Sequence, residues 1–133
     1  MARAPADPTA TLSVEGFAFP RSHRLLSPAE FQRVFTRTDY KTGGRHLLFL
    51  ARENGLDVPR LGLVIARKRS RRAVDRTRIK RHLRDSFRLR PAALAGLDVI
   101  VLLRANLHDP DPVTLRAEIE GLWDKLLAKR DKA

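Results

Sequence analysis

The segment covering residues 67–90, RKRSRRAVDRTRIKRHLRDSFRLR, most narrows the possible folds, because it combines dense positive charge with an apolar stripe. It contains twelve Lys or Arg residues and two Asp residues, so it carries +10 of the chain's net charge of +12. On a helical wheel with about 100° per residue, Ile79, Leu83 and Phe87 fall within about 80° of one another. We therefore expect a basic loop over residues 67–72 and a helix over residues 75–90 with one side in the core.

The cations of this segment stand where they weaken a helix. Arg76 and Arg78 lie near its expected start, where the positive end of the helix dipole disfavours each cation by about 0.3–1 kcal/mol. Basic residues also recur four apart from Arg76 to Arg88, and like charges at that spacing repel. Local rules broken in one place are typical of a functional site. The pattern therefore indicates a polyanionic partner that neutralises the charge.

The stretch SPAEFQRVFTRT predicts a short first helix. Ser27 is a favourable N-cap, Pro28 suits the first helical position, and Glu30 completes a capping box. Phe31 and Phe35 follow at helical spacing and give this helix an apolar face.

Three short apolar runs predict strands, and they cover residues 46–52, 61–67 and 98–103. The second run is apolar on both faces, which favours an internal position in the sheet. Apolar residues then recur at helical spacing over residues 112–129, after Asp111 as a suitable cap, and predict the last helix.

With 133 residues, the chain has the length of one domain, which we place at residues 19–130 after a loose tail over residues 1–18. It has no cysteine, no apolar run of membrane length and no secretory signal pattern, so we expect a cytoplasmic protein. The four histidines are scattered and the carboxylates form no paired pattern, so the sequence indicates no catalytic residue and no metal site in the protein.

The run LGLVIARKRSRRAVDRTRIKRHLRDSFR resembles the signature of the bacterial ribonuclease P protein component. In that family a Gly-apolar strand leads into a basic loop and an Arg-Asn-Arg-Ile-Lys-Arg helix. FPRSHRLLSPAEFQRVF is similar to the family's N-terminal block and LDVIVLLR to its last strand, so the resemblance covers about residues 19–129. One position departs, because Thr77 stands where the family usually has Asn and offers one hydroxyl in place of an amide with two donors.

The resemblance implies an α/β fold, an α+β sandwich in which about four strands and three helices follow the order αβββαβα. It also implies a left-handed crossover through the basic helix, although most such crossovers are right-handed.

The resemblance further implies the protein subunit of ribonuclease P, an endoribonuclease that removes the 5′ leader from precursor tRNA. Hydrolysis is then carried out by the catalytic RNA subunit with Mg²⁺, so no catalytic residue and no metal are expected in the protein. The expected partners are the catalytic RNA and the precursor tRNA leader. We expect no membrane contact and a monomeric protein apart from the RNA.

Two RNA-facing surfaces are implied. One would bind the backbone of the catalytic RNA through Arg67, Lys68, Arg69, Arg71, Arg72, Arg76, Thr77, Arg78, Lys80, Arg81, Arg84 and Arg88. The other is a cleft between the first helix and the sheet, which would hold the single-stranded leader through Phe31, Phe35, Arg33, Arg45 and His46. The spacing of the two phenylalanines fits core residues as well, so both interpretations stay open.

Other functions remain as alternatives. A general basic RNA-binding protein, such as a ribosomal protein or an RNA chaperone, is what composition alone favours. A membrane-surface protein would need a wider apolar helix face than the stripe from Ile79 to Phe87. A self-contained nuclease would need catalytic groups that the sequence does not indicate.

Overall fold

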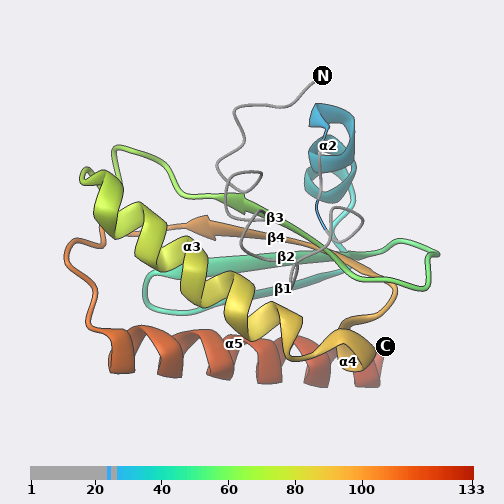
Figure 1. Ribbon diagram of the computed structural model, residues 1–133. Helices are drawn as coiled ribbons and strands as arrows, with labels where there is room; N and C mark the ends of the chain where they lie inside the picture. The colour runs from blue at the N-terminus through green and yellow to red at the C-terminus, as the bar shows by residue number, and fades with distance from the viewer. Residues whose placement is uncertain (1–23, 25–26) are drawn as a thin grey trace.

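The structure, a computed structural model, describes residue 24 and residues 27–133, so the predicted tail over residues 1–18 lies outside the described residues. The described part contains a four-stranded sheet in the order β1-β2-β4-β3, with helices on both faces (Figure 1). The strands are β1 (Tyr40–Gly43), β2 (Leu47–Glu53), β3 (Arg60–Val64) and β4 (Leu97–Leu103). The helices are α2 (Pro28–Thr36), α3 (Ala73–Arg88), the short α4 (Pro91–Leu94) and α5 (Pro112–Lys132). The predicted α/β class is confirmed.

The sheet is mixed because the chain crosses over between its last two strands. β1 pairs with β2 and β2 with β4 in antiparallel fashion, whereas β3 and β4 are parallel. α3 and α4 make the connection from β3 to β4, and α3 lies in front of the sheet in Figure 1. Both strands run from right to left in that view with β3 above β4, so the crossover has the expected left-handed sense.

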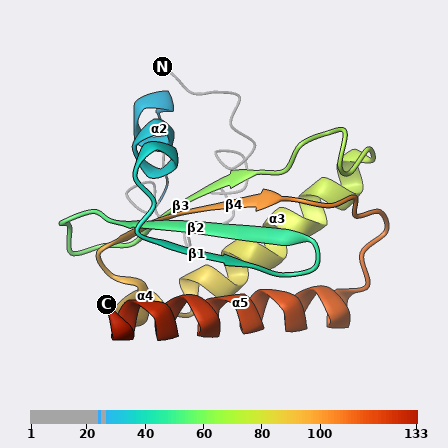
Figure 2. The ribbon, with the colours of Figure 1, turned by 180° about the vertical axis from the view of Figure 1, so that it is seen from behind.

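Alternation along the strands gives each face of the sheet its own apolar cluster. Leu47, Phe49 and Ala51 join the larger core, which α3 and α5 cover. Leu48 and Leu50 point to the opposite face, which we call the α2 face, where Leu50 packs with Val34 of α2 and Ile100. Figures 1 and 2 show α2 alone on that side among the described helices.

Aromatic side chains join the layers of the larger core. Trp123 of α5 is fully buried and meets the ring of Phe49 edge-on, with 4.6 Å between centroids. Its indole Nε1–H donates to Ser86 Oγ of α3 at 2.8 Å, which satisfies the polar atom of a buried ring. Phe49 therefore faces α5 and lies on the opposite side of the sheet from α2.

The predicted helix caps are confirmed. The Ser27 hydroxyl accepts from the amide of Glu30 at 3.2 Å, and the Glu30 carboxylate accepts from the amide of Ser27 at 3.0 Å. Asp111 caps α5 by accepting from the amide of Thr114 at 2.9 Å. These bonds fix where α2 and α5 begin, because they satisfy amides that have no partner inside the helix.

Three expectations need correction. The run 61–67 was predicted as an internal strand, but β3 stands at the edge of the sheet. Its two faces are apolar because Leu61 packs into the larger core while Val64 packs against the α2-face cluster. β1 was not indicated by any apolar run, and α5 extends three residues beyond the predicted 112–129.

Among the described residues, none of the helices combines the length and the apolar character that a membrane span requires.

Candidate nucleic-acid interface

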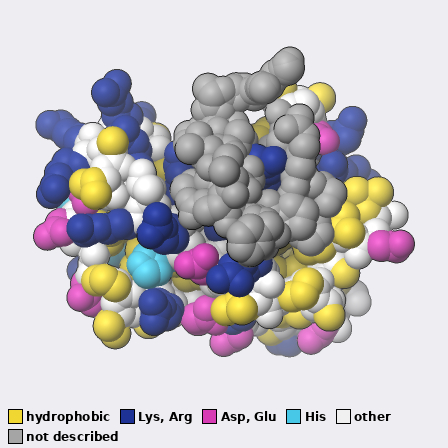
Figure 3. Space-filling view, viewed as in Figure 1, with side chains coloured by type: hydrophobic (Ala, Val, Ile, Leu, Met, Phe, Trp, Pro, Cys, Tyr) yellow, Lys and Arg dark blue, Asp and Glu magenta, His cyan; other side chains and the backbone are white. Residues whose placement is uncertain are grey.

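The basic loop, residues 67–72, is a compact turn between the end of β3 and the start of α3. The amides of Arg69 and Ser70 donate to the carbonyl of Ala66 at 3.0 and 3.2 Å, which closes the turn. Arg67, Lys68, Arg71 and Arg72 are exposed, whereas Arg69 is half-buried. Figure 3 shows Lys and Arg side chains gathered over this loop and the start of α3, at the left of the view.

Arg76 holds the basic loop against the helix. Its Nη1 donates to the carbonyls of Ser70 at 2.9 Å and Arg71 at 2.8 Å, and the side chain is half-buried. Arg76 was predicted only as an RNA contact. In the structure Arg76 also fixes the conformation of the basic loop, and thereby the positions of the exposed cations in that loop.

The connection between β4 and α5 packs on the same end of the molecule. The amide of Leu107 donates to the carbonyl of Arg69 at 2.8 Å, and the amide of Asp109 donates to Asp75 Oδ2 at 3.0 Å. Asp75 is fully buried in the first turn of α3, where a negative charge is favourable. Its Oδ1 has no hydrogen-bond partner among the described residues. Asp75 thus anchors the start of α3, a role the sequence did not indicate.

The exposed side of α3 is narrower than predicted. Thr77, Arg78, Arg81 and Arg88 are exposed and Lys80 is half-buried, as expected for a cationic face. Arg84, however, was predicted on that face and is only 5 % exposed. The prediction was wrong because the buried arc runs from Asp75 to Arg84 and covers about 180° of the wheel, well beyond the stripe from Ile79 to Phe87.

Electrostatics at this surface favour unprotonated His82. Partial burial lowers the pKa of His82 below its usual value, and the neighbouring cation Arg116 of α5 lowers it further. Arg81 acts in the same direction, whereas Asp85 opposes it. Burial first, and the neighbouring cations second, therefore favour the neutral imidazole.

The two phenylalanines of α2 have different surroundings. Phe31 is half-buried and packs against the cluster formed by Val34, Leu50 and Ile100. Phe35 is 43 % exposed. Of the two interpretations left open by their spacing, the core role fits Phe31, while Phe35 offers a ring on the surface.

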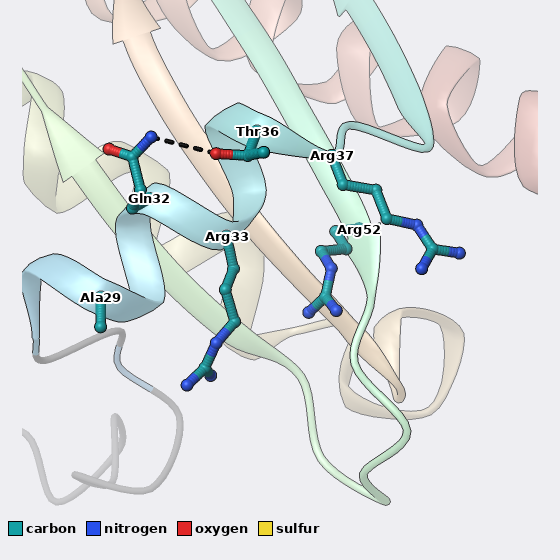
Figure 4. A pocket seen from close by; sticks show the side chains of 6 residues that line it. All are labelled: Ala29, Gln32, Arg33, Thr36, Arg37 and Arg52. Atoms are coloured by element: carbon teal, nitrogen blue, oxygen red, sulfur yellow. Dashed lines mark hydrogen bonds between the residues drawn. The ribbon is translucent and has the colours of Figure 1, made fainter.

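The structure separates the other residues predicted for the leader cleft. Arg33 is about 160° from both Phe31 and Phe35 on the helical wheel and lies on the other flank of α2. There it lines a hollow of about 370 Å³ with Arg37 and Arg52 (Figure 4). The predicted cleft therefore does not bring Arg33 together with the two rings.

Arg45 and His46 directly precede Leu47, the first residue of β2, and Arg45 is exposed. His46 Nδ1 is 2.9 Å from Glu118 Oε1 of α5. Glu118 Oε2 accepts from the amides of His46 at 2.7 Å and Leu47 at 2.9 Å, so this carboxylate fixes the start of the strand. The imidazole thus has a local structural partner.

Within the described part of the chain, no group of three or more His, Cys, Asp or Glu side chains is arranged to hold a metal ion.

Arg52 was not among the candidate residues predicted from the sequence. The signal was present, because strict alternation along β2 places Arg52 on the same face as Leu48 and Leu50.

A family model described as Ribonuclease P matches residues 19–127. The chain belongs to the ribonuclease P protein family. The "Ribonuclease P protein component" of Alcanivorax borkumensis is 50 % identical over 112 residues, covering 84 % of this chain and 93 % of that protein. The component from Pseudomonas entomophila is 47 % identical over 112 residues and covers 84 % of each chain.

Solved structures of the ribonuclease P family share the fold. The Staphylococcus aureus RNase P protein aligns with a TM-score of 0.68 and 25 % identity, covering 77 % of this chain and 94 % of that one. The Thermotoga maritima RNase P protein aligns with a TM-score of 0.65 and 29 % identity, covering 77 % and 96 %. The prediction of a protein subunit of ribonuclease P, an endoribonuclease that processes tRNA, is confirmed, and its partner is the RNase P RNA.

Proposed function

We propose that the basic loop and the exposed side of α3 bind the backbone of the catalytic RNA. The observation that carries this proposal is a group of exposed cations at one end of the molecule that form no ion pair with any described residue. These are Arg67, Lys68, Arg71, Arg72 and Arg81. Cations left unpaired at this density repel one another, and a phosphate backbone relieves that repulsion.

The mechanism follows from what these residues can do. Arginine forks bind phosphate oxygens in a bidentate way and position the RNA without reading its sequence. Hydrolysis is assigned to the RNA subunit with its Mg²⁺, as the family resemblance implies. The protein's task is then to neutralise charge and to hold the two RNAs in register. Its cytoplasmic location and monomeric state stay predictions.

We further propose that the 5′ leader of precursor tRNA lies on the α2 face of the sheet, beside Phe35. Leu48, Val64 and Leu102 are only partly buried there, and α2, which carries the exposed ring of Phe35, packs on the same face. Aromatic rings hold unpaired bases by stacking, at about 1–3 kcal/mol per base and without sequence preference. This suits a leader whose sequence differs from one tRNA to another.

Reconstitution tests the first surface. The wild-type protein, added to catalytic RNA and precursor tRNA at low Mg²⁺, should raise cleavage and should bind the RNA with a steep salt dependence. Replacing both Arg71 and Arg72 with Ala should lower the slope of log affinity against log salt by about 1 for each phosphate that the variant no longer neutralises. Lys125→Ala with Lys132→Ala removes the same charge from exposed positions of α5 and should leave the slope nearly unchanged. Equal slopes for the wild type and the arginine pair would contradict this assignment.

Substrate binding tests the second surface. Phe35→Ala should weaken binding of precursor tRNA by the reconstituted enzyme and should leave binding of leaderless tRNA unchanged. Phe31→Leu offers a comparison, because it changes the packed ring and keeps an apolar side chain in the cluster. If Phe35→Ala weakens both substrates equally, the ring does not contact the leader.

A further inference from the structure

Three arginines line the flank of α2 that faces away from Phe35. Arg33 and Arg37 come from α2 and the residue after it, and Arg52 comes from β2. Figure 4 shows Arg33 and Arg52 extending on the same side of α2, whereas the guanidinium of Arg37 extends away from them toward solvent. The three arginines line an open hollow of about 370 Å³, which we call the arginine pocket, and its lining is completed by Ala29, Gln32 and Thr36.

The lining of the arginine pocket carries three positive charges and no carboxylate. Neither Arg33 nor Arg52 forms an ion pair with another described residue. Arg37 lies 3.5 Å from Asp39, but its side chain is 72 % exposed, and exposed pairs of this kind contribute little. Three neighbouring cations without a counter-charge favour the binding of an anion.

The neutral residues of the lining also fit an anion. Gln32 Nε2 donates to Thr36 Oγ1 at 3.0 Å, which leaves the second N–H of the amide and the threonine hydroxyl as donors. Arginine forks match the geometry of phosphate oxygens. The volume lies within the range of about 300–1,000 Å³ that is common for ligand pockets. This set of donors therefore suits an oxyanion such as a backbone phosphate.

The position of the arginine pocket relates it to the α2 face of the sheet. Leu48 stands near the end of β2 that lies beside the basic loop, and Arg52 stands near the opposite end. A single-stranded RNA that passes from Phe35 around the end of α2 at Arg37 would reach the pocket. Nucleotides held beside Arg52 are therefore farther from the basic loop than nucleotides beside Leu48.

We propose that the arginine pocket binds a backbone phosphate of the leader, upstream of the nucleotides that contact Phe35. This inference rests on the proposed function, because it takes the leader to lie beside Phe35 and the catalytic RNA to lie on the basic loop. It adds a second contact, made by residues on the opposite flank of α2, and predicts that affinity depends on leader length.

A series of precursor tRNAs with leaders lengthened two nucleotides at a time tests the pocket in the reconstituted enzyme. With the wild-type protein, affinity should rise with the first nucleotides and rise again once the leader passes the end of α2. Arg33→Ala with Arg52→Ala should remove the second rise, a decrease of about tenfold, and keep the first. Arg33→Gln with Arg52→Gln keeps more of the side-chain stems and serves if the alanine pair does not fold.

The outcomes separate this inference from the function it rests on. If no leader of any length improves wild-type binding, the proposed leader site itself fails. If short leaders improve binding but longer ones add nothing, or if the arginine variants keep the second rise, the arginine pocket does not bind the leader. Lys125→Ala with Lys132→Ala removes the same charge elsewhere and should keep both rises, which excludes a general charge effect.

Discussion

Arg60 and Asp98 form a forked ion pair across the parallel strands β3 and β4. Arg60 Nε donates to Asp98 Oδ1 and Nη2 donates to Oδ2, both at 2.8 Å, and Asp98 is 1 % exposed. The third nitrogen, Nη1, donates to Glu30 Oε2 at 2.9 Å, in the first turn of α2. The hydrogen bond to Asp98 is the main cause of a raised pKa for Arg60. One guanidinium thus fastens α2 to the sheet.

Loss of the Asp98 carboxylate should destabilise the protein strongly. Asp98→Ala leaves Arg60 largely buried beside a missing partner, which typically costs about 3–5 kcal/mol. Urea denaturation followed by circular dichroism measures the change. Replacing both residues, with Asp98→Leu and Arg60→Met, should recover part of the stability because neither member of the buried pair is left without the other. A double variant as unstable as Asp98→Ala would show that the charge itself is not the cause.

Glu118 should protect the start of β2. Glu118→Ala removes the acceptor of the His46 and Leu47 amides, and an unpaired buried donor costs about 1–3 kcal/mol. Hydrogen exchange at the Leu47 amide should become faster, while exchange in the middle of β4 should change only with global stability. Glu118→Gln keeps an acceptor oxygen, so exchange at the Leu47 amide should be faster than in the wild type and slower than in Glu118→Ala. Unchanged exchange at Leu47 in the alanine variant would refute this role.

Stability should depend on pH through His82. Its pKa is lowered in the folded protein from a usual value of 6.5, so the unfolded chain takes up the proton first as pH falls. The stability that neutral His82 contributes is therefore present above about pH 6.5 and is lost as the pH falls toward the folded value. His82→Gln should lose less stability than the wild type between about pH 7.5 and 5.5. An NMR titration midpoint of the ring at or above 6.5 would contradict the prediction.

Thr77→Asn should leave stability unchanged and should maintain or tighten binding of the catalytic RNA. The Thr77 side chain is exposed and forms no hydrogen bond with any other described residue, so the fold does not require its hydroxyl. The amide would add donors between Arg76 and Arg78, where the family usually has them. A marked loss of RNA affinity in a filter-binding assay would show that threonine makes a contact of its own.

Local patterns were enough to predict the elements with strong local signals. The Ser27 and Asp111 caps and the stripe from Ile79 to Phe87 all appear in the structure, because each depends on residues within one or two helical turns. β1 could not be predicted in this way, since its four residues gain their order from pairing with β2. The count of four strands came from the family resemblance.

The candidate sites depended more on tertiary packing. The exposed cations of the basic loop followed from sequence, whereas the burial of Arg84 depends on how widely α3 is covered. The separation of Arg33 from Phe35 could have been read from the helical wheel. Its meeting with Arg52 required knowing that α2 lies across β2, an arrangement of segments far apart in the chain.

Both edges of the sheet carry a feature that discourages another chain from adding a strand. At β1 the Nζ of Lys129 donates to the carbonyl of Lys41, in a strand of only four residues. At β3, Arg24 forms a bridge with Leu61, so part of that edge is already occupied. Short, charged or occupied edges resist the edge-to-edge association that leads to aggregation. Both features therefore make it harder for a second copy of this chain to extend the sheet.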